Sequence, residues 1–153
     1  VSSSLIREDL QRGRLQQAAA KLGRHYALEG RVVRGKQLGR TLGYPTANTR
    51  FQGKKPALMG IYATWVHGVA EKPIASVSSV GTRPTVNGRE PLLEAHLFDF
   101  DGDLYGKTIR VEFIQKLRDE QKYDDLDSMV LQIHQDAKQA RAVLAGQTLG
   151  ECA

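Results

Sequence analysis

The stretch Leu92-Leu93-Glu94-Ala95-His96-Leu97-Phe98 alternates along its length in the way that a β-strand does. Successive side chains of a strand point to opposite faces, so Leu93, Ala95 and Leu97 form one apolar face. Glu94 shares the other face with Leu92, His96 and Phe98. The pattern therefore predicts a strand that buries one face and presents a carboxylate among apolar and aromatic neighbours on the other.

Four further segments have the same alternating or β-branched character, and turns rich in Gly, Pro and Asn separate them. They cover residues 25–34, 61–67, 74–80 and 108–115. Several short strands with turns between them are typical of a closed antiparallel barrel. We therefore expect a mainly β fold built around such a barrel.

The last third of the chain changes to helical periodicity, over about residues 124–145. Aspartates at the start of this segment and Gly146 beyond its end are typical of helix ends. We expect this helix to lie against the barrel, and two short helices to precede the barrel at residues 5–11 and 15–22. The apolar face of the long helix is marked by Leu126, Met129, Val130, Ile133, Ala137, Ala140 and Leu144.

The composition is that of one globular domain: 153 residues, of which 41% are hydrophobic and 25% charged. The net charge of +5 favours anionic partners, but the 22 basic residues form no long block, so a nucleotide explains it as well as a nucleic acid. Cys152 is the single cysteine, which excludes an intrachain disulfide. No apolar run approaches the ~18 residues that span a bilayer, and the N-terminal residues lack the apolar core that a secretion signal would have. We expect a cytoplasmic protein without a membrane partner.

A glycine-spaced loop, Gly39-Arg40-Thr41-Leu42-Gly43-Tyr44-Pro45-Thr46-Ala47-Asn48, is a candidate phosphate site. Pro45 biases the residue before it to an extended conformation, and in extended backbone Thr46 and Asn48 share a face. A Thr hydroxyl is a hard oxygen ligand for Mg²⁺, and the exposed amides of a glycine loop can bind an anion. The loop predicts a nucleotide phosphate with its metal; an ordinary surface loop is the alternative.

Glu94 is the candidate general base. Held near a substrate hydroxyl, its carboxylate could accept the proton as the oxygen attacks phosphorus. A solvated, outward-facing glutamate is the alternative. A second loop rich in Gly, Pro and hydroxyl groups, residues 81–88, either connects two strands or completes a binding cleft with the first loop.

Five blocks of sequence, in their order and spacing, resemble the riboflavin kinase family. The resemblance runs from about residue 24 to residue 144 and is closest to the kinase module of the bifunctional bacterial FAD synthetase, which makes FMN and then FAD. Val1-Ser2-Ser3-Ser4-Leu5-Ile6-Arg7 is similar to the signature that closes the upstream adenylyltransferase domain of that enzyme. The blocks are Leu42-Gly43-Tyr44-Pro45-Thr46-Ala47-Asn48, Gly60-Ile61-Tyr62, Val80-Gly81-Thr82-Arg83-Pro84-Thr85, Glu94-Ala95-His96-Leu97-Phe98-Asp99 and Asp103-Leu104-Tyr105-Gly106.

This resemblance implies a C-terminal fragment, in which residues 1–23 are a helical tail from the adenylyltransferase domain and residues 24–153 are the kinase domain. The barrel would cover about residues 24–117. It also implies a six-stranded antiparallel Greek-key barrel with a C-terminal helix, and an ATP-dependent enzyme that phosphorylates riboflavin to FMN.

The same resemblance implies roles for individual residues. Thr46 would ligate the Mg²⁺ that bridges the ATP phosphates, Asn48 would hold the metal or phosphate shell beside it, and Glu94 would be the general base. ATP would also be bound by Gly35, Lys36, Gly39, Arg40 and Gly43, and the flavin by Gly81, Thr82, Pro84, Thr85 and Arg118.

Two other functions fit parts of the sequence. A noncatalytic flavin-binding or sensor module would share the motifs without turning over ATP. A basic barrel that binds single-stranded nucleic acid fits less well, because aromatic residues are only 7% of the chain and do not alternate with basic ones. We expect riboflavin and ATP as small-molecule partners, and no nucleic acid.

Overall fold

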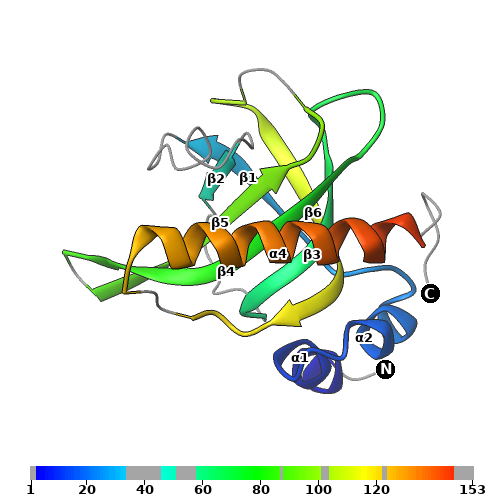
Figure 1. The fold of residues 1–153 in the computed structure, drawn as a ribbon. Helices are drawn as coiled ribbons and strands as arrows, with labels where there is room; N and C mark the ends of the chain where they lie inside the picture. Colours follow the sequence, from blue (N-terminus) through cyan, green and yellow to red (C-terminus); the bar gives the residue numbers. More distant parts are fainter. Residues whose placement is uncertain are drawn as a thin grey trace.

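The computed structural model describes residues 3–33, 46–50, 58–86, 88–100, 104–121 and 124–146. Six strands and three helices lie within these ranges (Figure 1). The strands are β1 (Ala27–Val33), β2 (Thr46–Arg50), β3 (Gly60–His67), β4 (Ile74–Thr85), β5 (Gly88–Leu97) and β6 (Thr108–Arg118), and the helices are α1 (Ser3–Gln11), α2 (Leu15–Leu22) and α4 (Leu126–Ala145).

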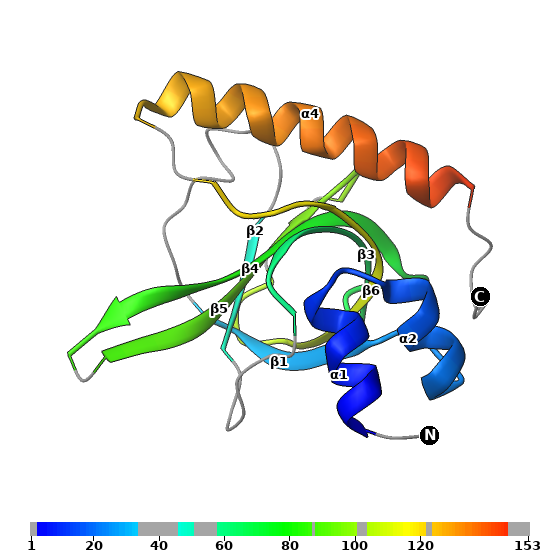
Figure 2. The ribbon, with the colours of Figure 1, turned by 90° about the horizontal axis from the view of Figure 1, so that it is seen from below.

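The six strands form a closed barrel in the order β1-β2-β5-β4-β3-β6, and every neighbouring pair is antiparallel. Figure 2, which looks roughly along the barrel, shows the strands as a ring with α4 on its outer side. The barrel closes through β6, which pairs with both β1 and β3. These features confirm the expected antiparallel Greek-key barrel with a C-terminal helix and short N-terminal helices.

Apolar side chains and a small group of hydroxyls fill the barrel. Tyr62 and Phe113 meet edge to face, with their ring centroids 5.2 Å apart. Beside them, the buried Oγ1 of Thr64 lies 2.6 Å from Oγ of Ser76 and 2.8 Å from Oγ of Ser78. Because these hydroxyls bond to one another, their burial leaves no unsatisfied group among them.

The helix α4 lies across the outer surface of the barrel, where it contacts β3, β4 and β6 (Figures 1 and 2). It begins after Asp125, whose Oδ1 accepts a hydrogen bond of 2.6 Å from the backbone N–H of Ser128. The expected helix over 124–145 is therefore present, and it packs through its small residues. The buried cluster under it contains Ala137, Ala140 and Leu144 of α4 with Ile61, Ala63, Val77, Phe98 and Ile114 of the barrel.

Several strands differ from the sequence pattern, most clearly β2 and β4. The pattern does not predict β2, because five residues without apolar alternation carry no strand signal, and pairing with β1 and β5 makes this segment a strand. Residues 81–85 belong to β4 rather than to a loop. In the described residues β3 pairs with β4 only as far as Val80, so Pro84 lies where β4 has β5 on one side alone. Figure 1 shows the resulting hairpin projecting beyond the barrel.

The two N-terminal helices pack near one end of the barrel (Figure 2). Leu10, Leu15 and Ala18 are buried in the same apolar cluster as Leu93 and Phe113 of the barrel. The domain boundary expected between residues 23 and 24 stays a prediction. The two helices before it pack into the same apolar core as the barrel. Among the described residues, no helix combines the length and the apolar character that crossing a membrane requires.

A substitution at Gly60 tests the tight contact between β3 and the end of β6. Gly60 has φ +122°, and a Cβ there would lie 2.8 Å from the backbone oxygen of Arg118. We expect Gly60→Ala to lower the free energy of unfolding by about 2–3 kcal/mol, measured by urea denaturation. In the control Gly146→Ala, φ is −87° and the nearest atom would be 3.6 Å away, so a change within about 0.5 kcal/mol is expected. Equal effects in both variants would contradict the contact.

Candidate active site

Asn48, Glu94 and Ser79 lie side by side on the outer surface of the barrel. Glu94 of β5 is directly opposite Asn48 of β2 on one side and Ser79 of β4 on the other. Directly opposed residues of antiparallel strands point to the same face. Leu93 and Ala95, which flank Glu94, are buried inside the barrel. The three polar side chains therefore form one outward-facing row across three strands.

The three side chains of this row differ in their exposure to solvent. Asn48 is 8% exposed, whereas Glu94 and Ser79 are half-buried. A half-buried carboxylate can reach a bound substrate while its neighbours exclude part of the surrounding water. Flanked by an amide and a hydroxyl, Glu94 has the chemistry of a general base for a substrate hydroxyl.

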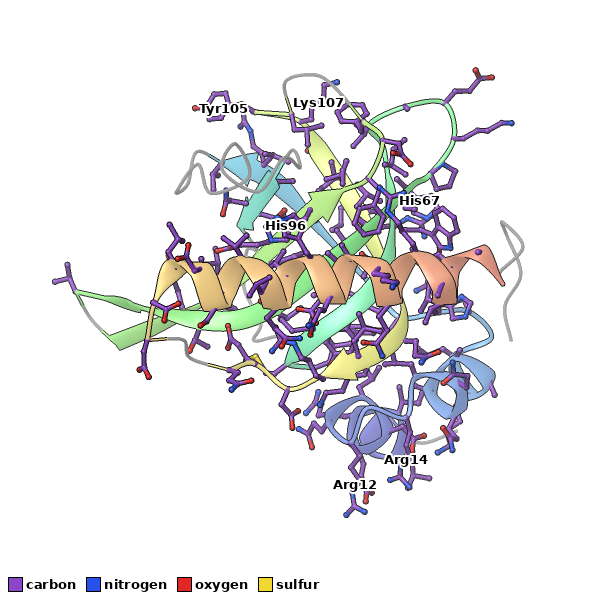
Figure 3. The ribbon with its side chains drawn as sticks, viewed as in Figure 1. Arg12, Arg14, His67, His96, Tyr105 and Lys107 are labelled. Carbon is purple, nitrogen blue, oxygen red and sulfur yellow. The ribbon has the colours of Figure 1, made fainter. Side chains whose placement is uncertain are left out.

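His96 belongs to the next outward-facing row, opposite Thr46 of β2 and Val77 of β4. Figure 3 shows its ring beside α4, and its exposed fraction is 7%. Burial lowers the pKa of His96 from the usual 6.5 to about 4, although the carboxylate of Asp136 acts in the opposite direction. His96 is therefore neutral at pH 7 and brings no positive charge to an anionic substrate.

Arg118, at the end of β6, continues the row of Glu94 on the far side of β3. Directly opposed residues run from Glu94 to Ser79, from Ser79 to Ile61 and from Ile61 to Arg118. The guanidinium of Arg118 forms a two-pronged ion pair with Asp136 of α4, in which Nε donates to Oδ1 at 2.9 Å and Nη2 to Oδ2 at 2.7 Å. This ion pair thus joins α4 to the end of β6.

The segment that follows β6 lies close to two glycines of the barrel. A Cβ on Gly60 would lie 2.8 Å from the backbone oxygen of Arg118, and a Cβ on Gly81 would lie 2.5 Å from the carboxylate of Glu120. Gly81 lies two residues beyond Ser79 on β4, on the same face. The carboxylate of Glu120 therefore borders the candidate site, and it would have to shift if residue 81 carried a Cβ.

Two other histidines meet away from this site. Nδ1 of His25 lies 3.2 Å from Oε2 of Glu112, and Nε2 of His67 lies 2.9 Å from Oε1 of the same carboxylate. Figure 3 shows His67 on a different part of the barrel from His96. Within the described ranges, no group of three or more His, Cys, Asp or Glu residues could hold a metal ion.

The structure describes some of the site residues proposed from the sequence and not others. Asn48 and Glu94 are direct neighbours, Gly81 and Thr82 continue β4 beyond Ser79, and Arg118 ends the row. Gly35, Lys36, Gly39, Arg40 and Gly43 lie outside the described residues, as do the side chains of Thr46, Pro84 and Thr85.

Three polar residues near the site, Asp136, Gln132 and Glu120, are not predicted by the sequence motifs. Asp136 carried a usable signal, because it lies three residues after Ile133 and four before Ala140, on the apolar face of the helix. A charged residue on such a face requires a partner when it is buried. The position of Glu120 over Gly81 depends on the path of the chain after β6, for which the sequence has no local signal.

One protein family matches most of the length of the chain. The family model described as "Flavokinase: Riboflavin kinase" matches residues 22–144. A bifunctional riboflavin kinase/FMN adenylyltransferase of Haemophilus influenzae is 42% identical over 93% of this chain and 46% of its own length. The protein of the same description from Escherichia coli K12 is 43% identical over 92% of this chain and 45% of its own length. The chain thus spans about half the length of these curated relatives.

Two solved structures are similar in fold. One from Streptococcus pneumoniae, described as a macrolide-efflux protein, has a TM-score of 0.81 and 34% identity and covers 92% of this chain and 46% of its own. A riboflavin kinase from Trypanosoma brucei has a TM-score of 0.56 and 22% identity and covers 78% of this chain and 77% of its own. At that identity the second likeness concerns the fold alone.

The lowered pKa of His96 predicts a loss of stability in mild acid. Between its unfolded pKa of 6.5 and its folded pKa of about 4, the unfolded chain binds more protons, so stability falls as the pH falls through this window. From pH 7 to pH 5, the free energy of unfolding should fall by about 2 kcal/mol less in His96→Gln than in the unaltered protein. Urea denaturation at both pH values measures this difference. His134→Gln, at an exposed position of α4, is the control and should follow the unaltered protein.

Proposed function

The chain belongs to the riboflavin kinase family, as its motifs indicate, and on that premise we propose that it transfers the γ-phosphoryl group of ATP to riboflavin. The products would be FMN and ADP. The observation that carries the proposal is the outward-facing row of Asn48, Glu94 and Ser79, which presents a half-buried carboxylate beside the Thr46–Asn48 motif of the family. The riboflavin kinase description of the matching family model supports the choice of substrate.

In the proposed reaction Glu94 acts as the general base. Its carboxylate takes the proton from the terminal 5′-hydroxyl of the ribityl chain, while that oxygen forms a bond to the γ-phosphorus and the bond to the β-bridging oxygen of ATP breaks. Phosphoryl transfer needs little covalent chemistry from the protein, so position and charge neutralisation should account for most of the acceleration. The strand β5 holds Glu94 between two paired strands and so limits its movement.

The donor set of this site fits Mg²⁺ rather than a metal held by the protein alone. Mg²⁺ is usually bound through one or two protein oxygens together with substrate phosphates and water. The hydroxyl of Thr46 and the side-chain oxygen of Asn48 are our proposed protein ligands, and the described residues contain no acidic or histidine cluster that would compete. When bound, Mg²⁺ would neutralise charge on the phosphates.

The remaining site residues keep the roles that the family resemblance implies. Residues of the β1–β2 connection would bind ATP, and residues of β4 together with Arg118 would contact the flavin. The first group is Gly35, Lys36, Gly39, Arg40 and Gly43, and the second is Gly81, Thr82, Pro84, Thr85 and Arg118.

We extend the proposal to the longer protein from the length of its relatives. Those relatives are described as riboflavin kinase/FMN adenylyltransferases and are about twice as long as this chain. In the full-length enzyme an adenylyltransferase domain would therefore precede the kinase domain. A kinase that consumes ATP would work in the cytoplasm, where ATP is available.

Replacing Glu94 tests the proposed base directly. We expect Glu94→Gln to reduce FMN formation from riboflavin, ATP and Mg²⁺ by about 10²–10⁴-fold, because the amide cannot accept the proton. Chromatography of the flavins measures the rate, and FMN without FAD is the expected product of the unaltered chain. Glu90→Gln is the matched control, because Glu90 lies four residues before Glu94 on the same strand, β5, and on the same face of the sheet.

Flavin binding by the unaltered chain without FMN formation would support the noncatalytic flavin-binding module instead. Full activity of Glu94→Gln, with the unaltered chain active, would remove Glu94 from the role of base and leave the kinase function in place.

Removal of the metal tests the proposed role of Thr46. We expect EDTA to abolish FMN formation and an excess of Mg²⁺ to restore it. Thr46→Val has nearly the same shape but no hydroxyl, so it should need about tenfold more Mg²⁺ for half-maximal rate, corresponding to the loss of one oxygen ligand. An unchanged Mg²⁺ requirement in Thr46→Val would show that another group holds the metal.

A further inference from the structure

The ion pair between Arg118 and Asp136 joins α4 to the end of β6 through a buried carboxylate. Nε and Nη2 of Arg118 donate to the two carboxylate oxygens of Asp136, at 2.9 and 2.7 Å. Nη1 of Arg118 also donates to the backbone oxygen of Asp119, at 3.0 Å. Three bonds in the plane of one guanidinium restrict both its position and its orientation.

Asp136 is held as firmly as its partner. Its residue is 3% exposed, and Nε2 of Gln132, one helical turn earlier, donates to Oδ1 at 3.0 Å. Burial of a lone carboxylate costs several kcal/mol, and such a group is tolerated only with full pairing. Since Ala137 and Ala140 beside it are packed on the barrel, the carboxylate has little freedom to move.

The bonds of Arg118 also determine the path of the chain after β6. The backbone oxygen of Arg118 lies against Gly60, and the carboxylate of Glu120 lies against Gly81. Gly81 is on β4, two residues from Ser79, and Gly60 is on β3, next to Ile61. Residues 118–121 therefore form one border of the candidate site, and Asp136 holds the first residue of this border.

The order of the strands indicates which substrate lies at this border. Around the barrel, Asn48 of β2 is on one side of Glu94, and Ser79, Ile61 and Arg118 follow on the other. A base must touch the acceptor hydroxyl while that oxygen faces the γ-phosphoryl group. With the nucleotide on the β2 side, the acceptor lies on the β4 side of Glu94, toward Gly81 and residues 118–121. Ile61, between Ser79 and Arg118, is buried under α4.

We propose that Asp136 is a positioning residue for the riboflavin half of the site, acting through Arg118 and the border formed by residues 118–121. This inference rests on the proposed riboflavin kinase function. Asp136 touches neither substrate, and its effect passes through the orientation of the guanidinium. Its loss should therefore weaken productive binding of riboflavin more than binding of ATP.

The test compares two neutralised ion pairs that both join α4 to the barrel. Asp136→Asn keeps the shape of the side chain and removes the charge that orients Arg118. We expect the KM for riboflavin to rise about tenfold and the KM for ATP to change less than twofold, since a displaced positioning group affects the substrate it orients.

Asp99→Asn is the matched control. Asp99 accepts from Nη1 of Arg141 of α4 at 2.9 Å, but it is exposed and outside the row of Glu94. Its φ of +53° suits Asn as well as Asp, so the substitution adds no backbone strain. Both KM values should stay unchanged in this variant.

A second set of variants separates positioning from a general structural role. In an Arg118→Gln background, Asp136→Asn should change the KM for riboflavin less than twofold, because the residue it acts through is already absent. A tenfold rise in that background would overturn the proposal. Gln132→Ala, which removes the amide bond to Asp136 and keeps the ion pair, should raise the same KM by a smaller factor, and it serves if Asp136→Asn folds poorly.

Hydrogen exchange supplies a readout that is independent of turnover. We expect faster amide exchange in a peptide covering residues 117–121 of Asp136→Asn, with no change in Asp99→Asn. If the unaltered chain makes no FMN, the proposed function fails, and riboflavin dissociation constants from flavin fluorescence then replace KM in the same comparison. Unchanged riboflavin binding and unchanged exchange in Asp136→Asn would refute the role of Asp136, whether or not FMN is formed.

Discussion

The pairing of β5 with both β2 and β4 is the constraint on which the candidate site depends. It places Glu94 between Asn48 and Ser79 and points Leu93 and Ala95, which are fully buried, into the barrel. A slip of one residue would exchange the two faces, so Glu94 would enter the core and its apolar neighbours would face water. The core of the barrel thus stabilises the geometry of the site, because both depend on one register.

The helix α4 adds a second constraint, which is electrostatic. Its small residues allow close packing on β3, β4 and β6, and this packing buries the carboxylate of Asp136. A buried carboxylate needs a cation, and Arg118 at the end of β6 supplies it. His96 stays neutral at pH 7 because burial outweighs the nearby carboxylate. The site therefore has a paired charge at Arg118, on the side away from β2, and a neutral ring at His96, opposite Thr46 of β2.

Strands with clear alternation, and the long helix with its apolar face, were predictable because their periodicity is local. The strand β2 was not, since Thr46-Ala47-Asn48-Thr49-Arg50 is a strand only through its two partners. The extension of β4 through Pro84 had the same cause, because a proline is acceptable there only where the pairing with β3 has ended. Asp136 had a local signal on the apolar face of its helix, but its partner is 18 residues away in the chain.

The sequence by itself determined the alternation that turns Glu94 away from the core, the helical face of residues 124–145, and the motifs that place the chain in the riboflavin kinase family. These properties follow from residues close together in the chain or from short blocks of fixed spacing. Only the tertiary structure decided that Asn48, Glu94 and Ser79 lie in one row, that Arg118 pairs with Asp136, and that Glu120 lies over Gly81. These contacts join distant segments, and their geometry is set by barrel closure and helix packing rather than by any local pattern.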